Sequence, residues 1–207
     1  MEWSNMLYFI AMSMLLTLVP GPDIVYVMTQ SMTQGKRSGI ATAVGLCTGL
    51  LVHTTAAALG VSAIFQQSVV AFRLLKYAGA AYLFYLAYKA LREKGDSLTE
   101  EEHKHVGMAS LYRQGICMNI LNPKVGLFFL AFIPQFVNAS AGSVTLQMVI
   151  LGLLFIAQAM LIFAVVAVLA NKLGRKLLDK PKIVQYVNRA KAGIFALIGI
   201  KLALAHQ

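Results

Sequence analysis

The sequence predicts an all-α integral membrane protein with six transmembrane helices, arranged as a 3+3 inverted repeat in which helices 1 and 4 are broken at mid-membrane. The first observation is composition: of 207 residues, 58% are hydrophobic and only 13% are charged, roughly half the charge of a typical soluble domain. The second is that the apolar residues come in long runs, near the length that crosses a bilayer. The third is that two of these runs, about 100 residues apart, are each interrupted by a proline followed by a charge.

The first half of the chain contains three apolar runs, and the first of them is broken. The sequence Pro20-Gly21-Pro22-Asp23 interrupts it, because a proline inside a helix removes a backbone hydrogen bond and costs ~3 kcal/mol. The second run is rich in small residues, so we expect a neighbouring helix to approach it closely at Gly45 and Gly49. Tyrosines of the third run are expected to pack against other helices or to anchor at the interface. The three expected helices cover residues 5–32, 40–65 and 69–91.

The second half repeats this layout. Its first run is broken at Asn122-Pro123-Lys124, and a strongly basic link runs from Lys172 to Lys191. The last run is the shortest, so we expect it to cross with little tilt or to reach only part-way. The three expected helices cover residues 112–136, 144–170 and 192–205.

A polar stretch divides the chain into halves of similar length. We expect residues 1–92 to form the first three-helix repeat, residues 93–110 a cytoplasmic linker, and residues 111–207 the second repeat, all within one transmembrane domain. The Pro22-Asp23 pair aligns with Pro123-Lys124, which supports an internal repeat. An odd number of spans in each half forces the halves into opposite orientations, so the predicted repeat is inverted.

The basic residues predict the orientation. The links after the first, third and fifth runs together carry 13 Lys and Arg, whereas the other side holds only Arg73 and Lys76. Because basic links stay in the cytoplasm, both termini are expected to be extracytoplasmic. The predicted location is the bacterial plasma (inner) membrane, in which the protein is multi-pass.

The two breaks have a chemistry that suits a zwitterion. A proline leaves the carbonyl four residues earlier without its helical donor, which frees the carbonyls of Leu16, Leu18 and Asn119. These oxygens can accept hydrogen bonds from an ammonium group. The half-helix that begins after each break has unpaired N–H groups and a positive dipole end, which suits a carboxylate. An amino acid is therefore the natural substrate class, although small anions could also use these helix ends.

Two charges lie at matching positions in the breaks. Asp23 would be the second residue of its half-helix, where an acid is favourable, and it could simply stabilise the start of that helix. Lys124 opposes the dipole of its half-helix, and each charge at mid-bilayer costs ~3 kcal/mol. We expect Asp23 and Lys124 to face each other, to pair in the empty protein, and to exchange partners when substrate binds. Asp23 could also carry a coupling proton.

Other polar residues within the runs have simpler interpretations beside functional ones. Asn122 is expected to cap the half-helix that follows it, and Asn119 is equally suited to packing or to binding. His53 could be a hydrogen-bonded packing residue or a proton relay. Gln135 and Gln158 are expected to form hydrogen bonds between helices.

Several other classes of function fit poorly. The basic residues lie between apolar runs rather than on one soluble face, which argues against nucleic-acid binding. No Gly-rich phosphate loop is present, so ATP is not the expected energy source. Cys47 and Cys117 predict neither a disulfide nor a metal site, and His103 and His105 are expected to lie in a solvated loop. We expect no cofactor and no metal. An exporter of another small solute or of a metal cation remains the alternative, and an intramembrane enzyme, for which Asp23 and His53 would be the acid–base pair, is less favoured.

Short boxes along the chain resemble one known family. They are Pro20 to Asp23, the glycine-rich start of the second run, Leu74 to Leu83, Asn119 to Lys124, and Pro134 to Phe136. The chain is similar in these boxes, and over essentially its whole length, to the LysE/RhtB family of amino-acid exporters (LysE-type translocators).

This resemblance implies export of amino acids or close derivatives from the cytoplasm, driven by proton antiport. Typical substrates of the family are homoserine, threonine, leucine, lysine, cysteine and their relatives. The family's conserved acid falls on Asp23. Together with His53, whose position within an apolar run allows a proton relay, Asp23 is a candidate for proton coupling. A homodimer would be compatible with the small-residue faces. The expected substrate-binding residues are Pro20, Gly21, Pro22, Asp23, Asn119, Asn122, Pro123 and Lys124.

Overall fold

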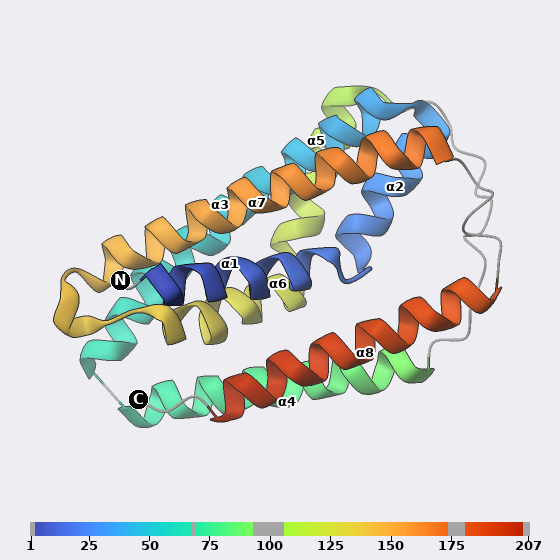
Figure 1. The fold of residues 1–207 in the computed structure, drawn as a ribbon. Helices are drawn as coiled ribbons and strands as arrows, with labels where there is room; N and C mark the ends of the chain where they lie inside the picture. Colours follow the sequence, from blue (N-terminus) through green and yellow to red (C-terminus); the bar gives the residue numbers. More distant parts are fainter. Residues whose placement is uncertain (1–2, 68, 93–105, 174–180, 205–207) are drawn as a thin grey trace.

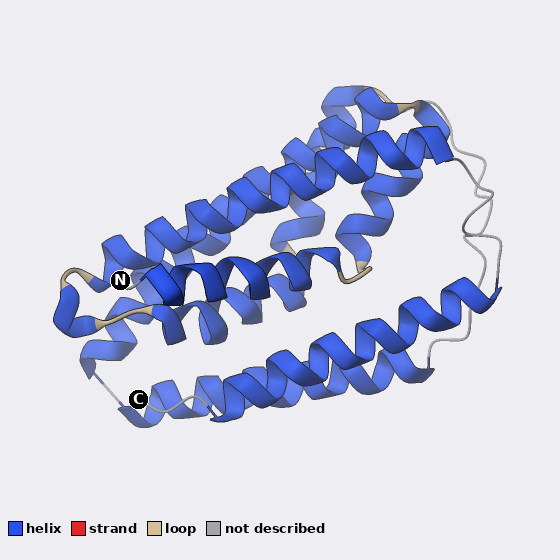
Figure 2. Ribbon diagram, in the orientation of Figure 1, coloured by secondary structure: helices blue, strands red, loops and turns tan. Residues whose placement is uncertain are grey.

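The protein is built from helices throughout the part that the computed structural model describes, which is residues 3–67, 69–92, 106–173 and 181–204. Figure 2 shows no strand in these ranges. The elements, in chain order, are α1 (Trp3–Leu18), α2 (Pro22–Gln34), α3 (Lys36–Gln67), α4 (Val69–Arg92), α5 (Met108–Ile120), α6 (Pro123–Leu127), the π-helix η1 (Phe128–Phe132), the 3₁₀-helices η2 (Ile133–Phe136) and η3 (Ala139–Ala141), α7 (Val144–Leu173) and α8 (Pro181–Leu204).

The helices form two groups that meet along the broken elements. In the larger group α3 packs against both α5 and α7, while α1 and α2 pack against α7. The smaller group is the antiparallel pair α4 and α8 (Figure 1), which contacts the larger group through η1, α3 and α1. The buried apolar core is continuous across this junction, because it includes Phe9 of α1, Phe132 of η1 and Leu202 of α8.

Four elements or pairs of elements are suited to crossing a membrane. Two single helices are long enough and apolar enough to cross a membrane, namely α3 over Lys36–Gly60 and α7 over Val144–Lys172. Two bent pairs meet the same criterion when each pair is taken as one span. They are α1 with α2, bent by 58°, and α5 with the segment Pro123–Phe136, bent by 49°. The prediction of an all-helical membrane protein is confirmed, and this criterion gives two to four spans in the described chain. It does not include α4 and α8, which carry more charge than α3 and α7 relative to their length.

The helix bounds differ from the expected ones in two places. The last helix, α8, begins at Pro181 rather than near residue 192, so half of the expected basic link is helical. Proline favours the first position of a helix because its missing N–H is not needed there. Likewise, α5 begins at Met108, so the last residues of the expected linker 93–110 are its first turn, and residues 93–105 lie outside the described ranges.

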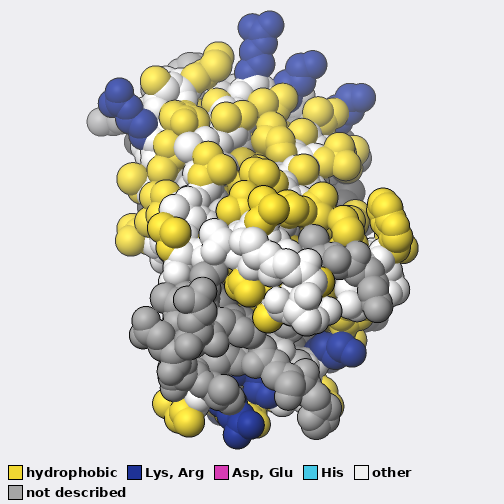
Figure 3. All heavy atoms as spheres, turned by 90° about the vertical axis from the view of Figure 1, so that its left-hand side faces the viewer, with side chains coloured by type: hydrophobic (Ala, Val, Ile, Leu, Met, Phe, Trp, Pro, Cys, Tyr) yellow, Lys and Arg dark blue, Asp and Glu magenta, His cyan; other side chains and the backbone are white. Residues whose placement is uncertain are grey.

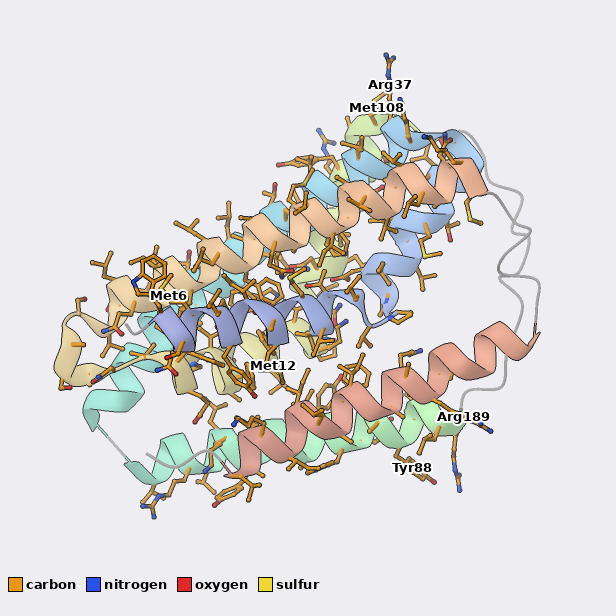
Figure 4. All side chains as sticks on the ribbon, viewed as in Figure 1. Met6, Met12, Arg37, Tyr88, Met108 and Arg189 are labelled. Atoms are coloured by element: carbon orange, nitrogen blue, oxygen red, sulfur yellow. The ribbon has the colours of Figure 1, made fainter. Side chains whose placement is uncertain are left out.

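The two ends of the molecule differ in their basic residues. The N and C marks lie at the same end in Figure 1, whereas Arg37 and Arg189 lie toward the opposite end in Figure 4. Figure 3 looks onto the end that carries the termini, and hydrophobic side chains cover much of the upper part of this face, with Lys and Arg at its upper and lower margins. Lys201 of α8 also lies toward the end with the termini, beside Asn5 and Tyr8, so the orientation of the termini stays a prediction.

Glycines allow α3 and α5 to lie in close contact. A Cβ at Gly45 would overlap the carbonyl of Tyr112, and one at Gly49 would lie 2.8 Å from the Cβ of Asn119. In return, a Cβ at Gly115 would lie 2.7 Å from the carbonyl oxygen of Thr42. The close approach predicted at Gly45 and Gly49 is thus confirmed, and it fixes how near α5, which carries Asn119, stands to α3.

Replacing Gly115 by alanine should destabilise the protein by about 1–3 kcal/mol, because the added methyl group must push α5 away from α3. The same change at Gly193, where a Cβ would meet no heavy atom within 4 Å, should be neutral or stabilise by up to ~1 kcal/mol, since alanine favours a helix. Thermal unfolding of both purified variants in detergent measures the difference. Equal melting temperatures would show that Gly115 does not hold this contact.

Candidate functional site

The first break places a carboxylate inside the protein. α1 ends at Leu18, and α2 begins at Pro22 after the extended residue Gly21. Asp23 is therefore the second residue of the half-helix, as predicted, and only 5% of its surface is exposed. It is the one acidic residue among those that the structure describes.

The second break places an amine and two amides at the same depth of the fold. α5 ends at Ile120, and α6 begins at Pro123. The side chain of Asn122 caps α6 by accepting a hydrogen bond from the backbone N–H of Lys124 at 3.0 Å, which confirms the predicted cap. Lys124 is the second residue of its half-helix and is 9% exposed, so the two charges occupy matching positions.

Amide groups of the second break hold the carboxylate of the first. Nδ2 of Asn122 donates to Oδ1 of Asp23 at 2.9 Å, and Nδ2 of Asn119 donates to Oδ2 at 3.1 Å. Asn122 thus both caps α6 and binds the carboxylate. These bonds replace part of the hydration that a buried carboxylate loses, without which its burial would be very costly.

Two of the three freed carbonyls, those of Leu16 and Asn119, accept hydrogen bonds from side chains of other elements, as the prolines predict. Nζ of Lys124 donates to the carbonyl oxygen of Leu16 at 3.3 Å, and Nε2 of His53 donates to that of Asn119 at 3.0 Å. The amine of the second break therefore satisfies the first break, while the amides of the second break bind Asp23. Lys124 and Asp23 also interact electrostatically, but the hydrogen bonds of each go to other groups, which differs from the expected direct pair.

A small cavity of about 20 Å³ lies where these groups meet. A single water needs at least ~10–15 Å³ of such space, so the cavity has room for about one water and not for an amino acid. Its polar end carries Asp23 and Lys124. Its lining residues are Leu16, Thr17, Asp23, Ile24, Leu50, Asn119, Lys124, Val125, Phe155, Ala159 and Phe163.

Three polar residues near the cavity are linked by hydrogen bonds, and the sequence predicted a role for only one of them, Gln158. Nε2 of Gln158 donates to Oγ1 of Thr17 at 3.0 Å, which confirms the expected interhelical bond of Gln158, and Thr17 donates to the carbonyl of Ser13. Oγ of Ser13 and Oε1 of Gln158 are buried without a hydrogen-bond partner in the described structure. The threonine and serine carry no sequence signal, because both residues bond back to their own helices in many membrane spans.

The remaining predicted residues take separate places. Pro20, Gly21, Pro22 and Pro123 shape the breaks, and a Cβ at Gly21 would lie 3.1 Å from Nζ of Lys124, so glycine leaves room for the amine. His53 reaches the carbonyl of Asn119 rather than a carboxylate.

Gln135 and the pair His103 and His105 lie away from the breaks. Gln135 donates to Ala131 of its own segment, so the interhelical bond expected of it is not made. His103 and His105 lie outside the described residues. Within the described ranges no group of three His, Cys, Asp or Glu side chains could hold a metal.

Comparison with known protein families identifies the family to which the chain belongs. The LysE type translocator family matches residues 14–206, which is nearly the whole chain. The chain belongs to this family. The resemblance inferred from the boxes is thereby confirmed, and the membership makes the chain a membrane translocator by descent.

Two relatives carry functional names. The homoserine/homoserine lactone efflux protein of Salmonella typhimurium (strain LT2) is 32% identical over 199 residues, which cover 96% of each chain. The leucine efflux protein of Salmonella choleraesuis is 31% identical over 130 residues, 61% of this chain and 60% of the relative. The uncharacterized membrane protein YrhP of Bacillus subtilis is 31% identical over 210 residues, 97% of this chain and 99% of the relative. No solved structure matches the chain.

The Asn122 side chain should matter more for stability than an ordinary helix cap. Asn122→Ala removes the cap of α6, worth ~1 kcal/mol, and also one donor to a buried carboxylate, worth roughly 1.5–3 kcal/mol. Asn138 offers a matched control, because its side chain caps η3 on an exposed loop by accepting from Ser140 at 3.0 Å.

We expect Asn122→Ala to lower the melting temperature of the detergent-purified protein well beyond the effect of Asn138→Ala. Similar losses in the two variants would mean that the bond from Asn122 to Asp23 contributes little.

Proposed function

We propose that the protein is a secondary active exporter of amino acids or close derivatives, of the homoserine, threonine or leucine kind, working by proton antiport. The observation that carries this is the meeting of a buried carboxylate and a buried amine in one cavity, with apolar walls from Leu50, Phe155 and Phe163. A zwitterion with a short side chain complements all three features. The family membership and the names of the two efflux relatives agree with it.

In this proposal each end of the substrate replaces a group of the protein. The substrate ammonium takes the place of Lys124 on the carbonyl of Leu16 and lies beside Asp23. The substrate carboxylate then meets the displaced amine of Lys124 and the N–H groups at the start of a half-helix. Because the cavity holds only about one water, binding requires the two breaks to move apart.

The proposed architecture is that of alternating access. Residues 1–92 and 111–207 form two inverted repeats of three spans each, with α4 and α8 as the third spans and both termini extracytoplasmic. Discontinuous helices that meet near the bilayer midplane are the usual binding site of such transporters. The correspondence of Asp23 and Lys124, each second in its half-helix, supports the repeat.

The energy source in this proposal is the proton gradient. Moving one charge across the membrane supplies ~2.3 kcal/mol per 100 mV, so one inward proton supports appreciable export. Asp23 is the proposed carrier, since it is a buried carboxylate in contact with the substrate site. His53 is the second candidate, and it connects to the site through the carbonyl of Asn119.

Asp23→Asn and Lys124→Gln should each abolish efflux while leaving an inserted, folded protein. Labelled homoserine, threonine and leucine, loaded into cells as dipeptides, should leave cells with the wild-type protein faster than cells without it, and not faster in either variant. Lys172→Gln, which removes an exposed lysine in the last turn of α7, is the matched control and should keep wild-type efflux. Full activity of both site variants would overturn the assigned site.

A substrate gradient should drive protons the opposite way. In proteoliposomes that carry a trapped pH dye, an outward gradient of a substrate identified by the efflux assay should acidify the lumen. Asp23→Asn should remove this signal and His53→Gln should keep it, if Asp23 is the carrier. The reverse result would assign the proton to His53, and substrate movement without any pH signal would contradict proton antiport.

A further inference from the structure

A second cavity lies at the end of the protein that carries both termini. Its volume is about 240 Å³, some twelve times that of the cavity at the breaks. It is formed by the first turns of α1, by η1 and η2, and by the last turn of α8. Its lining residues are Asn5, Tyr8, Phe132, Gln135, Phe136 and Lys201.

Lys201, an exposed residue beside an aromatic ring, supplies a positive charge to this cavity. Its Nζ atom lies 5.0 Å from the centre of the Tyr8 ring. A cation over an aromatic ring is attracted to the face of the ring, and this attraction does not require the hydrogen bonds that the ammonium group can donate. The ammonium can therefore still donate to an anion in the cavity.

Gln135 supplies the complementary acceptor. Its Nε2 donates to the carbonyl oxygen of Ala131 at 3.2 Å, which turns the amide so that Oε1 is the group left to accept from an ammonium. Phe132 and Phe136 add apolar surface. The cavity thus combines a cation, an acceptor and an apolar wall, the same combination as the site at the breaks.

A chain of phenylalanine rings separates the two cavities. Phe155, in the wall of the inner cavity, lies 5.4 Å from Phe128 between ring centres, and Phe128 stacks on Phe132 at 4.7 Å. Phe132 in turn lies 5.1 Å from Phe136, and both line the outer cavity. All four rings are buried, so packed aromatic side chains occupy the space between the two cavities, and we call this chain of rings the barrier.

The barrier is built on an irregular segment. Phe128–Phe132 is a π-helix, and Ile133–Phe136 is a 3₁₀-helix. Such departures from α-helical geometry are uncommon and occur frequently at functional sites and hinges. A Cβ at Gly79 of α4 would lie 2.6 Å from the Cβ of Ala131 in this segment, so α4 packs closely against the segment that carries the rings.

We infer that the outer cavity is a second substrate site, at which Lys201 binds the carboxylate of an amino acid that leaves the protein. This inference rests on the proposed function and on the expected orientation, in which the termini face outward. In the cycle, rewinding of η1 and η2 removes the rings from the path, and the substrate passes from the breaks to Lys201 and Gln135 before release.

The outer site can be tested without relying on transport. A single reporter cysteine, Asn5→Cys, is placed in a chain that also carries Cys47→Ala and Cys117→Ser. Its labelling by a membrane-impermeant thiol reagent is followed in intact spheroplasts, with increasing external leucine or homoserine. We expect both amino acids to slow labelling, whereas leucinamide and inorganic phosphate should not, because the site needs a carboxylate together with an ammonium.

Variants of Lys201 give the decisive comparison. Lys201→Gln should raise the protecting concentration roughly tenfold, the effect of losing a charged hydrogen bond, while Lys201→Arg and the control Lys172→Gln should keep protection. Labelling that no amino acid slows, or protection that Lys201→Gln leaves unchanged, would overturn the site. Protection by phosphate alone would identify Lys201 as a contact for lipid headgroups instead, and labelling only from the cytoplasmic face would overturn the exit assignment.

The same cells separate this inference from the proposed function. If the wild-type protein exports leucine or homoserine and neither slows labelling, only the outer site is wrong. If the wild-type protein exports no amino acid, the proposed function fails, whatever the labelling shows.

Discussion

The hydrogen bonds from Asn119 and Asn122 to Asp23 are the interaction on which the rest of the structure depends. A carboxylate buried in a low-dielectric interior is tolerated only with partners, and both of these donors come from the other half of the chain. Satisfying Asp23 therefore requires the two breaks to meet. Once they meet, the close α3–α5 contact at Gly45 and Gly115 holds the second break at the right depth.

Each break supplies hydrogen-bond partners to the other, which explains why the fold tolerates both breaks. Each proline costs its helix a hydrogen bond, and the carbonyl freed at Leu16 is bonded by Lys124 of the other break. Neither half could close its own break with these groups. The polar centre of the fold and the candidate binding site are consequently the same set of atoms, so a substrate that binds there competes directly with the bonds that hold the halves together.

Local features of the sequence predicted the parts of the site that depend on local physics. The prolines located both breaks and the freed carbonyl of Leu16, and the Asn-Pro pair located the cap at Asn122. The pairing of Asn119 and Asn122 with Asp23 could not be predicted, because it depends on how two distant segments dock. The π-helix at Phe128–Phe132 also lacked a signal, since Phe-Phe-Leu-Ala-Phe is compatible with an ordinary helix and only tertiary packing selects the wider turn.

The hydrogen bonds at the breaks also give a physical reason why the proposed transport cycle should depend on binding a zwitterion. In the substrate-free protein the buried charges at the breaks are satisfied by Asn119, Asn122 and the carbonyl of Leu16, and in the proposed antiport Asp23 takes up its proton before the protein returns to its inward-facing state. A bound zwitterion can replace both sets of partners at once. A ligand with only an ammonium or only a carboxylate would displace one set and leave the other charge without its partner, which costs several kcal/mol in a buried site. The arrangement therefore disfavours transport of a ligand that carries only one of the two charges. It does so through the same hydrogen bonds that hold the empty protein together.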